Sequence, residues 1–375
     1  MKQATSLVGL CVLGLLALGL VMLYSLSPLQ DNLKIVTHQL VAAGIGLVAA
    51  IVMAMIDYRR LRAWSWVLGL AAVALLVAVL IPGVGYKANG ARRWFRLGSF
   101  QCQPSDFAKV ALLVGLAHYG AWGEARMRTF RRGVVYPALA IGPVLVLLFA
   151  EPDWGTALLL GAVSAVVLLV AGVRWSYLLP PALLAAAFIG VLLAMNPMRS
   201  DRVHSWLHLE ETKDAVGYQA WQARLALGVG GVTGVGLDHS RQKRFVPEHR
   251  TDFIYAIIGE EFGLAGSAAV LTAFLVFFIC GLFIASRAPD RFGLLLGTGI
   301  SFLIGLQALI NIGVVTGALP NKGLALPFVS YGGTNLIVML FCTGILISIA
   351  RFGVEDPARE SFAQNLPGLP ITRLA

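Results

Sequence analysis

The chain has 375 residues, of which 58% are hydrophobic and only 13% are charged. Soluble domains carry about 25% charged residues, so this composition excludes an ordinary soluble fold and indicates a membrane protein. The formal net charge is +10, and in so apolar a chain we assign the cations to membrane topology and anionic lipid, not to nucleic-acid binding.

Apolar stretches of roughly 20 residues recur along the chain, and each is long enough to cross a hydrocarbon core of about 30 Å. They predict an all-α polytopic membrane protein with about ten transmembrane helices. The first stretch is longer than the apolar part of a signal peptide, and no clear A-x-A site follows it, so we expect an uncleaved span. The spans are expected near residues 6–26, 36–56, 64–82, 104–121, 134–150, 155–172, 177–195, 253–285, 293–317 and 327–350.

Arginines predict the orientation of these spans, because they follow every even-numbered span and positive charge marks cytoplasmic loops. Both termini are therefore expected in the cytoplasm, and residues 1–353 should form one membrane domain followed by a short tail, 354–375. Two of the outer loops break this charge pattern: the first outer segment (83–103) and the large outer loop (196–252), which separates spans seven and eight. The cytoplasmic arginines are Arg59, Arg60, Arg62, Arg126, Arg128, Arg131, Arg132, Arg174, Arg287, Arg291 and Arg351.

The first outer segment carries a basic cluster and no acid. Its cations are Lys87, Arg92, Arg93 and Arg96. Topology disfavours cations in a short outer loop, so this cluster needs another explanation. One is the binding of an anionic substrate or lipid headgroup, and the other is anchoring at the membrane interface beside Trp94.

The large outer loop contains an amphipathic stretch and a glycine run. Tyr218, Trp221 and Leu225 have helical spacing, which predicts a short helix lying at the membrane interface. Glycines then recur between Gly228 and Gly236. No Walker Lys-Ser/Thr pair follows them, so we favour close packing or a re-entrant turn over a phosphate cradle.

The sequence predicts no metal site. His204 and His208 are spaced i, i+4 in the large outer loop with Glu210 nearby, but two histidines do not complete a site. The four cysteines are scattered and form no C-x-x-C, so they indicate neither a disulfide framework nor zinc.

The segment after Pro247 carries the strongest candidate for chemistry, Asp252, where the large outer loop enters span eight. An aspartate there also suits a helix N-cap, and that interpretation stays open. On a helix Glu260 lies about 80° from Asp252 and Glu261 about 180° away, so we expect Asp252 and Glu260 to line one cavity and Glu261 to point elsewhere. Span eight is too long for a single crossing, so its first turns, 253–261, should leave the core or border a polar cavity.

Span four begins with Ser105 and Asp106, and Lys109 lies one turn inside the apolar helix. Charges at membrane depth cost about 2.5 to 3.5 kcal/mol on insertion scales, which makes them candidates for function. Asp106 and Lys109 are close enough to pair. A structural ion pair and a cation directed at a bound anion both remain open.

Two further outer segments break the apolar pattern. Glu151-Pro152-Asp153 joins spans five and six, and we interpret it as a turn with the N-cap of span six. Prolines and glycines between Leu319 and Gly333 indicate broken helix, which is tolerated at membrane depth only where protein or a cavity covers it.

Five short motifs occur in order on the layout of spans described above: Asn89-Gly90-Ala91-Arg92-Arg93-Trp94, the Gln-Pro-Ser-Asp-Phe-Ala-Lys run from Gln103, Gly217-Tyr218-Gln219, the Pro-Glu-x-x-Thr-Asp-Phe segment from Pro247 and Ser330-Tyr331-Gly332-Gly333. Together these segments resemble the SEDS family, which includes FtsW and RodA, over nearly the whole chain. Two departures stand out: Arg250 precedes Thr-Asp where the family usually has His, and Thr334-Asn335 follows the double glycine where it usually has two serines. The segments Ser240-Arg241-Gln242-Lys243 and Asn321-Lys322-Gly323-Leu324 look more like the FtsW branch than the RodA branch.

The resemblance implies an enzyme that polymerises lipid II into peptidoglycan glycan strands on the outer leaflet. The family's essential aspartate corresponds to Asp252, which would be the general base for the acceptor hydroxyl. Its lysine in span four corresponds to Lys109 and its preceding arginine to Arg92 or Arg93, which would stabilise the pyrophosphate leaving group. Because of the shifted position, His249 is left out of the catalytic set. The substrate-binding candidates are Lys109, Arg92, Arg93, Asp106, Glu248, Glu260 and Ser330.

A divalent cation, Mg²⁺ or Mn²⁺, would suit the same charge stabilisation, although no ligand set in the sequence requires one. The resemblance also implies a class B penicillin-binding protein, a single-span transpeptidase, as partner, with other divisome proteins at the septum of the bacterial cytoplasmic membrane. The alternatives are a lipid II flippase, a RodA-type elongation polymerase and a scaffold that only binds partners.

Overall fold

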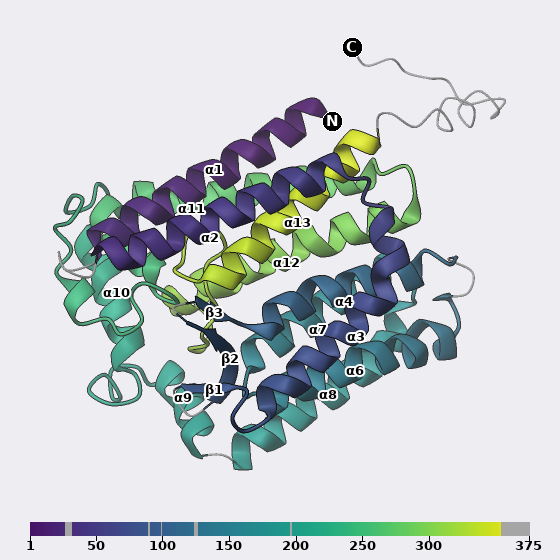
Figure 1. Cartoon of the computed structure of the whole chain (residues 1–375). Coiled ribbons are helices and arrows are strands. Elements are labelled where there is room, and N and C mark those ends of the chain that lie inside the picture. The colour runs from purple at the N-terminus through teal and green to yellow at the C-terminus, as the bar shows by residue number, and fades with distance from the viewer. Residues whose placement is uncertain (27–31, 89–90, 99, 124–126, 196, 354–375) are drawn as a thin grey trace.

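A computed structural model of the chain describes residues 1–26, 32–88, 91–98, 100–123, 127–195 and 197–353. The predicted tail, 354–375, lies outside the described residues. The long helices lie side by side along one direction, and a small sheet with two further helices gathers at one end (Figure 1). The helices are α1 (Lys2–Ser25), α2 (Asn32–Met55), α3 (Arg60–Leu80), α4 (Pro104–Gly120), η1 (Arg131–Val135), α6 (Tyr136–Ala150), α7 (Trp154–Val170), α8 (Trp175–Met195), α9 (Pro197–Leu207), α10 (Tyr218–Gly230), η2 (Gln242–Arg244), α11 (Ile254–Ser286), α12 (Arg291–Val315) and α13 (Gly333–Phe352).

Each predicted span coincides with a helix, which confirms a polytopic helical membrane protein. Within the described residues, eight helices are long and apolar enough to cross a membrane. The helices for spans four and six, α4 and α7, are shorter at 17 residues each. The total of ten spans therefore stays a prediction.

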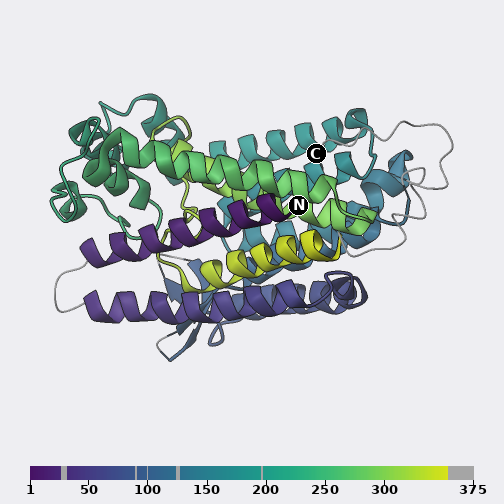
Figure 2. The same ribbon diagram turned by 90° about the horizontal axis from the view of Figure 1, so that it is seen from above.

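Small residues bring the helices close together. Figure 2 shows α2 running alongside α13 and α1 alongside α11, and each of these pairs is in contact. A Cβ atom at Gly344 of α13 would lie 2.4 Å from the Ala50 carbonyl oxygen of α2, and one at Gly46 of α2 would lie 2.6 Å from the Leu340 side chain. Glycine is thus required where these backbones meet, as is common between membrane helices.

We call the end of the molecule that carries the sheet, α9 and α10 the outer end, following the predicted orientation. The N-terminus and the end of α13 both lie at the opposite end (Figure 1). At the outer end, Trp206 Nε1 and Arg224 Nη2 donate to the Gly317 carbonyl oxygen at 2.9 and 3.3 Å. These bonds attach the large outer loop to the end of α12.

The first outer segment forms a sheet, which the sequence analysis did not predict. Its strands are β1 (Tyr86–Ala88), β2 (Ala91–Leu97) and β3 (Phe100–Cys102), paired antiparallel in that order. Gly98 has a φ of +63° where the chain turns from β2 into β3. Successive side chains of a strand alternate between two faces, so the neighbouring arginines Arg92 and Arg93 point in opposite directions.

The length of α11 is explained by a break at Gly263, which has a φ of +65° and a ψ of −161°. The residues that follow α10 cover this break. Val235 N–H donates to the Glu260 carbonyl at 3.0 Å, and Leu264 N–H donates to the Gly231 carbonyl at 2.9 Å. The backbone groups that the break releases are thus satisfied by protein, as membrane depth demands.

Two glycines of the run, Gly230 and Gly234, pack closely, as predicted. A Cβ at Gly230 would lie 1.9 Å from the Gly259 carbonyl oxygen, and one at Gly234 would lie 2.1 Å from that of Glu261. The predicted helix at Tyr218 is also confirmed, since α10 spans Tyr218–Gly230 and buries Ala223 on α11. The first turns of α11 are buried under this cover.

Candidate functional site

Asp252 does not cap the helix that follows it. Helix α11 begins at Ile254, its N-cap residue is Phe253, and no side chain donates or accepts a capping bond there. Thr251 is also engaged elsewhere, because its hydroxyl donates to the Glu248 carboxylate at 2.9 Å. The N-cap interpretation of Asp252 is therefore wrong, and its carboxylate is available for another task.

The main chain around Asp252 is held by the segments that flank span ten. Ser330 Oγ donates to the Thr251 carbonyl at 2.5 Å, and Tyr331 N–H donates to the Arg250 carbonyl at 2.9 Å. Asn311 Nδ2, from α12, donates to the carbonyl of Asp252 itself at 2.7 Å. Ser330, predicted to bind substrate, thus contacts the chain beside the candidate base.

The Asp252 carboxylate has a perturbed pKa. Burial raises its pKa to about 7, the negative charges of Glu248 and Asp153 add to the rise, and Arg93 opposes it. A base works best when its pKa lies near the working pH. The predicted base is thus placed among groups that tune it to neutral pH, and two of them, Arg93 and Glu248, are predicted site residues.

Arg93 joins the sheet to the turn between α6 and α7. Its Nε donates to the Glu151 carbonyl at 2.9 Å and its Nη2 to the Pro152 carbonyl at 2.6 Å. Arg92, on the other side of β2, makes a long contact of 3.5 Å to the Leu80 carbonyl. Of the two arginines, Arg93 is the one whose charge acts on the Asp252 carboxylate.

The turn itself contains two buried acids. Asp153 accepts from Gln103 Nε2 and Ser105 Oγ, both at 3.3 Å, and from Thr156 N–H at 3.4 Å, which confirms the predicted N-cap of span six. Glu151 is fully buried, and neither carboxylate oxygen has a hydrogen-bond partner among the described residues. Burial, followed by the charge of Asp153, raises the pKa of Glu151 to about 8.

Lys109 and Asp106 form a buried ion pair. Lys109 Nζ lies 2.8 Å from Asp106 Oδ1, and the two side chains are 3% and 5% exposed. The ammonium also donates to Gln307 Oε1 and Asn335 Oδ1 at 3.3 Å each. The structural ion pair is thus present, and an anion would reach Lys109 only by replacing one of these partners.

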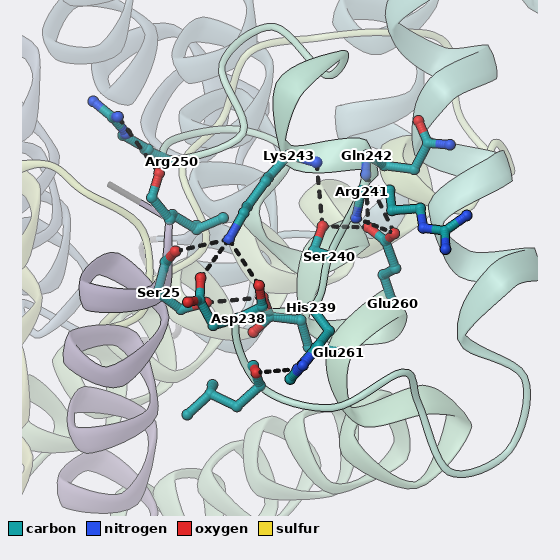
Figure 3. A network of polar contacts seen from close by, with 12 residues as sticks. Ser25, Asp238, His239, Ser240, Arg241, Gln242, Lys243, Arg250, Glu260 and Glu261 are labelled. Atoms are coloured by element: carbon teal, nitrogen blue, oxygen red, sulfur yellow. Dashed lines mark hydrogen bonds and ion pairs between the residues drawn. The ribbon is translucent and has the colours of Figure 1, made fainter. Parts of the chain in front are cut away.

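Glu260 is occupied by the large outer loop. Its carboxylate accepts a short hydrogen bond from Ser240 Oγ and others from the N–H groups of Arg241 at 2.8 Å and Gln242 at 3.2 Å (Figure 3). The charges that act on the Asp252 carboxylate are Glu248, Asp153 and Arg93, without Glu260. The structure gives Glu260 a structural role, and the expectation that it shares a cavity with Asp252 receives no support.

Glu261 points to a different neighbour, as expected. It accepts from Ser25 Oγ, at the outer end of α1, at 2.8 Å. Lys243 donates to the Ser25 carbonyl at 3.2 Å and to the Asp238 carboxylate at 2.5 Å, so the same loop is also tied to α1 (Figure 3). Of the two consecutive acids, Glu260 thus binds the large outer loop and Glu261 binds α1.

Among the described residues, no group of three or more His, Cys, Asp or Glu side chains is placed to hold a metal ion. The rings of His204 and His208 stack with centroids 4.7 Å apart. The divalent cation therefore stays a prediction.

Uncharged residues that were not predicted from the sequence also shape this site. Asn311 holds the Asp252 main chain, and Gly323 lies directly against its carboxylate. Gln307 and Asn335 complete the surroundings of Lys109. The one available signal was the spacing of Gln307 and Asn311, i, i+4 on an apolar helix, which puts two amides on one face.

Comparison with known proteins identifies close relatives. A family model described as FTSW_RODA_SPOVE, cell cycle protein, matches residues 5–354. A probable peptidoglycan glycosyltransferase FtsW of Trichlorobacter lovleyi is 39% identical over 348 residues, which cover 91% of this chain and 91% of the relative. Stage V sporulation protein E of Bacillus subtilis is 40% identical over 347 residues, which cover 90% and 94%.

Solved structures share the fold. One, described as "Structural coordination of polymerization and crosslinking by a peptidoglycan synthase complex", contains a chain that matches with a TM-score of 0.80 and 30% identity, covering 93% of this chain and 98% of that one. The crystal structure of the rod shape determining protein RodA of Thermus thermophilus matches with a TM-score of 0.70 and 30% identity, covering 93% and 97%.

Proposed function

The chain belongs to the FtsW/RodA/SpoVE family, and from this membership and its outer site we propose that it is a peptidoglycan glycosyltransferase that polymerises lipid II. The observation that carries the proposal is Asp252, a carboxylate with a pKa raised to about 7 whose backbone is fixed from α12 and from the segment before α13. Such a group is suited to remove a proton from a sugar hydroxyl at neutral pH.

In the proposed reaction Asp252 accepts the proton of the acceptor hydroxyl. The hydroxyl oxygen forms a bond to the anomeric carbon of the donor, and the bond from that carbon to the polyprenyl pyrophosphate breaks. The leaving group departs with the bonding electrons, so negative charge grows on the pyrophosphate. Arg93 is the cation whose charge acts on the Asp252 carboxylate, and it would stabilise the negative charge on the pyrophosphate.

Lys109 is the second predicted cation for the pyrophosphate. It is buried against Asp106, so binding an anion requires one of its neutral partners, Gln307 or Asn335, to withdraw. Those two contacts are 3.3 Å long, which makes them the weaker ones. We propose that Asp106 holds the Lys109 ammonium in place while the substrate replaces one of the two amides.

The test is polymerisation of lipid II by the purified protein. Asp252→Ala should lower the rate by about 100-fold or more, which is the contribution expected of a general base. Asp214→Ala, which removes an exposed aspartate of the large outer loop, is the matched control and should keep the wild-type rate. A wild-type rate in Asp252→Ala would refute the proposed role.

The rival function is transport of lipid II. A flippase would move labelled lipid II across vesicle membranes without forming polymer, and Asp252→Ala would then have to abolish that movement. Assaying both polymer and movement on the same vesicles separates the two functions. A scaffold would leave both signals unaffected by the substitution.

We further propose a role in division, supported by curated relatives named FtsW. The proposed partner is a class B penicillin-binding protein, at the septum and alongside other divisome proteins. Depletion should produce filaments if the chain acts in division, rounded cells if it acts in elongation, and a sporulation defect alone if it acts as its relative Stage V sporulation protein E is named. Co-purification of the transpeptidase with the full chain tests the partner.

A further inference from the structure

The Asp252 carboxylate lies against the α-carbon of Gly323. A Cβ atom at position 323 would be 2.5 Å from Asp252 Oδ2 and 3.5 Å from its Cγ. Gly323 is not among the glycines with positive φ, so its backbone conformation would accept a side chain. What a side chain at this position would meet is the predicted base itself.

The loop that carries Gly323 is fixed to the main chain of Asp252 by one side chain. Asn311 Nδ2 donates to the carbonyl of Asp252 at 2.7 Å and to that of Leu324 at 2.7 Å. One turn earlier on α12, Gln307 Nε2 donates to the Ala325 carbonyl at 2.8 Å. Asn311 is 2% exposed, so water does not replace these bonds at low cost.

We propose that Gly323 and Asn311 are positioning residues for Asp252. Asn311 sets the distance between the Asp252 peptide and the loop, and the missing side chain at position 323 leaves the space that the carboxylate occupies. The inference rests on the proposed glycosyltransferase function and deepens it, because it names the residues that direct the base at the acceptor hydroxyl.

Gly323→Ala tests the space directly. Ordinary contact between a methyl carbon and an oxygen needs about 1 Å more than the structure offers, so the carboxylate must rotate away. A misplacement of about 1 Å can cost about 100-fold in rate. We expect kcat for lipid II polymerisation to fall by about that factor, with KM for lipid II and the melting temperature close to the wild-type values.

The matched control is Gly228→Ala in α10, at the same outer end, where a Cβ would meet nothing within 4 Å. It should keep kcat, KM and melting temperature. Asn311→Ala is the second variant, since it removes the donor to both carbonyls. We expect kcat to fall at least tenfold while KM changes by less than threefold.

The outcomes separate this inference from the proposed function. If Asp252→Ala is inactive but Gly323→Ala keeps a kcat within threefold of wild type, the positioning role is wrong and the glycosyltransferase stands. If Asp252→Ala polymerises normally, the base itself is wrong. A Gly323→Ala protein that fails to fold, melts at least 10 °C lower, or shows a raised KM at unchanged kcat would mean that the contact serves packing or binding, and would overturn the inference.

Discussion

Asp252 is useful only when it is ionised, and its neighbours set the pH at which that happens. Its pKa is raised from 3.8 to about 7, first by burial and then by Glu248 and Asp153. A base with this pKa is half ionised near pH 7, whereas an exposed aspartate would be fully ionised but also a much weaker acceptor of protons. The acids around Asp252 therefore lower the fraction of Asp252 that is ionised at neutral pH, and at the same time make the ionised carboxylate a stronger base.

The pH dependence of polymerisation follows from this arrangement. We expect kcat/KM to rise with pH and to reach half of its maximum near pH 7, because the active form of Asp252 in the substrate-free protein is the deprotonated one. Glu248→Gln removes a negative neighbour, so the pKa of Asp252 should fall and the midpoint should move to lower pH. The pH profile of kcat/KM for the two proteins is the measurement.

Glu210→Gln, at an exposed acid of the large outer loop, is the control for that experiment and should leave the midpoint unchanged. A Glu248→Gln profile that coincides with the wild-type profile, or that moves to higher pH, would contradict the assigned electrostatic influence of Glu248.

Glu151 carries a prediction about stability. Its pKa is raised from 4.5 in the unfolded chain to about 8 in the fold. Because the pKa of Glu151 is higher in the folded state, its protonation favours the folded state. This contribution to the free energy of unfolding is complete below about pH 4.5. It is lost as the pH rises to about 8, at roughly 1.4 kcal/mol per pH unit. Glu151→Gln, a neutral side chain of the same shape, should flatten this decline.

Melting temperatures between about pH 5 and pH 8 measure the effect of Glu151. Wild type should lose stability across that window, and Glu151→Gln should lose clearly less. Parallel curves for the two proteins would show that the Glu151 carboxyl is not buried as described.

At the scale of single residues, the sequence predicts the charged members of the site but not their uncharged supports. Charged residues at or near membrane depth are costly and therefore stand out as candidates for function. This is how the sequence points to Asp252, Lys109 and Arg93. Asn311 and Gly323 look like ordinary residues of a span and a loop. Their roles depend on contacts between segments 59 and 71 residues away from Asp252, which spacing along one chain does not reveal.

At the scale of elements, apolar length predicts every long helix, while the outer sheet escapes prediction. The strand β2 contains Arg92, Arg93 and Arg96, so it lacks the alternation of apolar and polar residues by which strands are recognised. Its stability comes from pairing with β1 and β3 and from the bonds of Arg93 to the turn before α7. Tertiary contacts thus determine that residues 91–97 form a strand, although their own sequence pattern favours neither a strand nor a helix.

The glycine run is an element whose function the structure defines. Gly234 has a φ of +80°, and a Cβ there would lie 2.1 Å from the Glu261 carbonyl oxygen. Gly234→Ala would therefore combine backbone strain with a clash against backbone that cannot move freely. We expect a loss of about 2 to 4 kcal/mol, seen as a lower melting temperature and a lower yield of folded protein.

Gly228→Ala, where the added methyl group meets open space, should be neutral or slightly stabilising because alanine favours helix over glycine. Equal melting temperatures for Gly234→Ala and wild type would mean that the run does not pack on the broken helix α11.

At the scale of the whole molecule, the proposed chemistry lies at one end, and the arginines from which the orientation is predicted lie near the other. Arg93 on β2 and Asp153 in the turn before α7 are far from Asp252 along the chain, yet the charges of both act on its carboxylate. The sheet that contains β2 lies at the outer end, beside α9 and α10 of the large outer loop (Figure 1). A reaction on a lipid-linked sugar needs this arrangement, because the sugar stays in water while the lipid stays in the bilayer. The proposed function therefore requires the predicted orientation of the molecule in the membrane.

Labelling with a membrane-impermeant thiol reagent tests that orientation. In a chain whose four native cysteines are replaced by serine or alanine, Ala215→Cys in the large outer loop should react in intact spheroplasts, and Ser286→Cys at the other end of α11 should react only after permeabilisation. Both positions are exposed, so accessibility differs only through the membrane. Labelling of Ser286→Cys from outside, with Ala215→Cys protected, would invert the topology. Asp252 would then face the cytoplasm, where a polymerase of outer-leaflet lipid II has no substrate, so the function would fail together with the orientation.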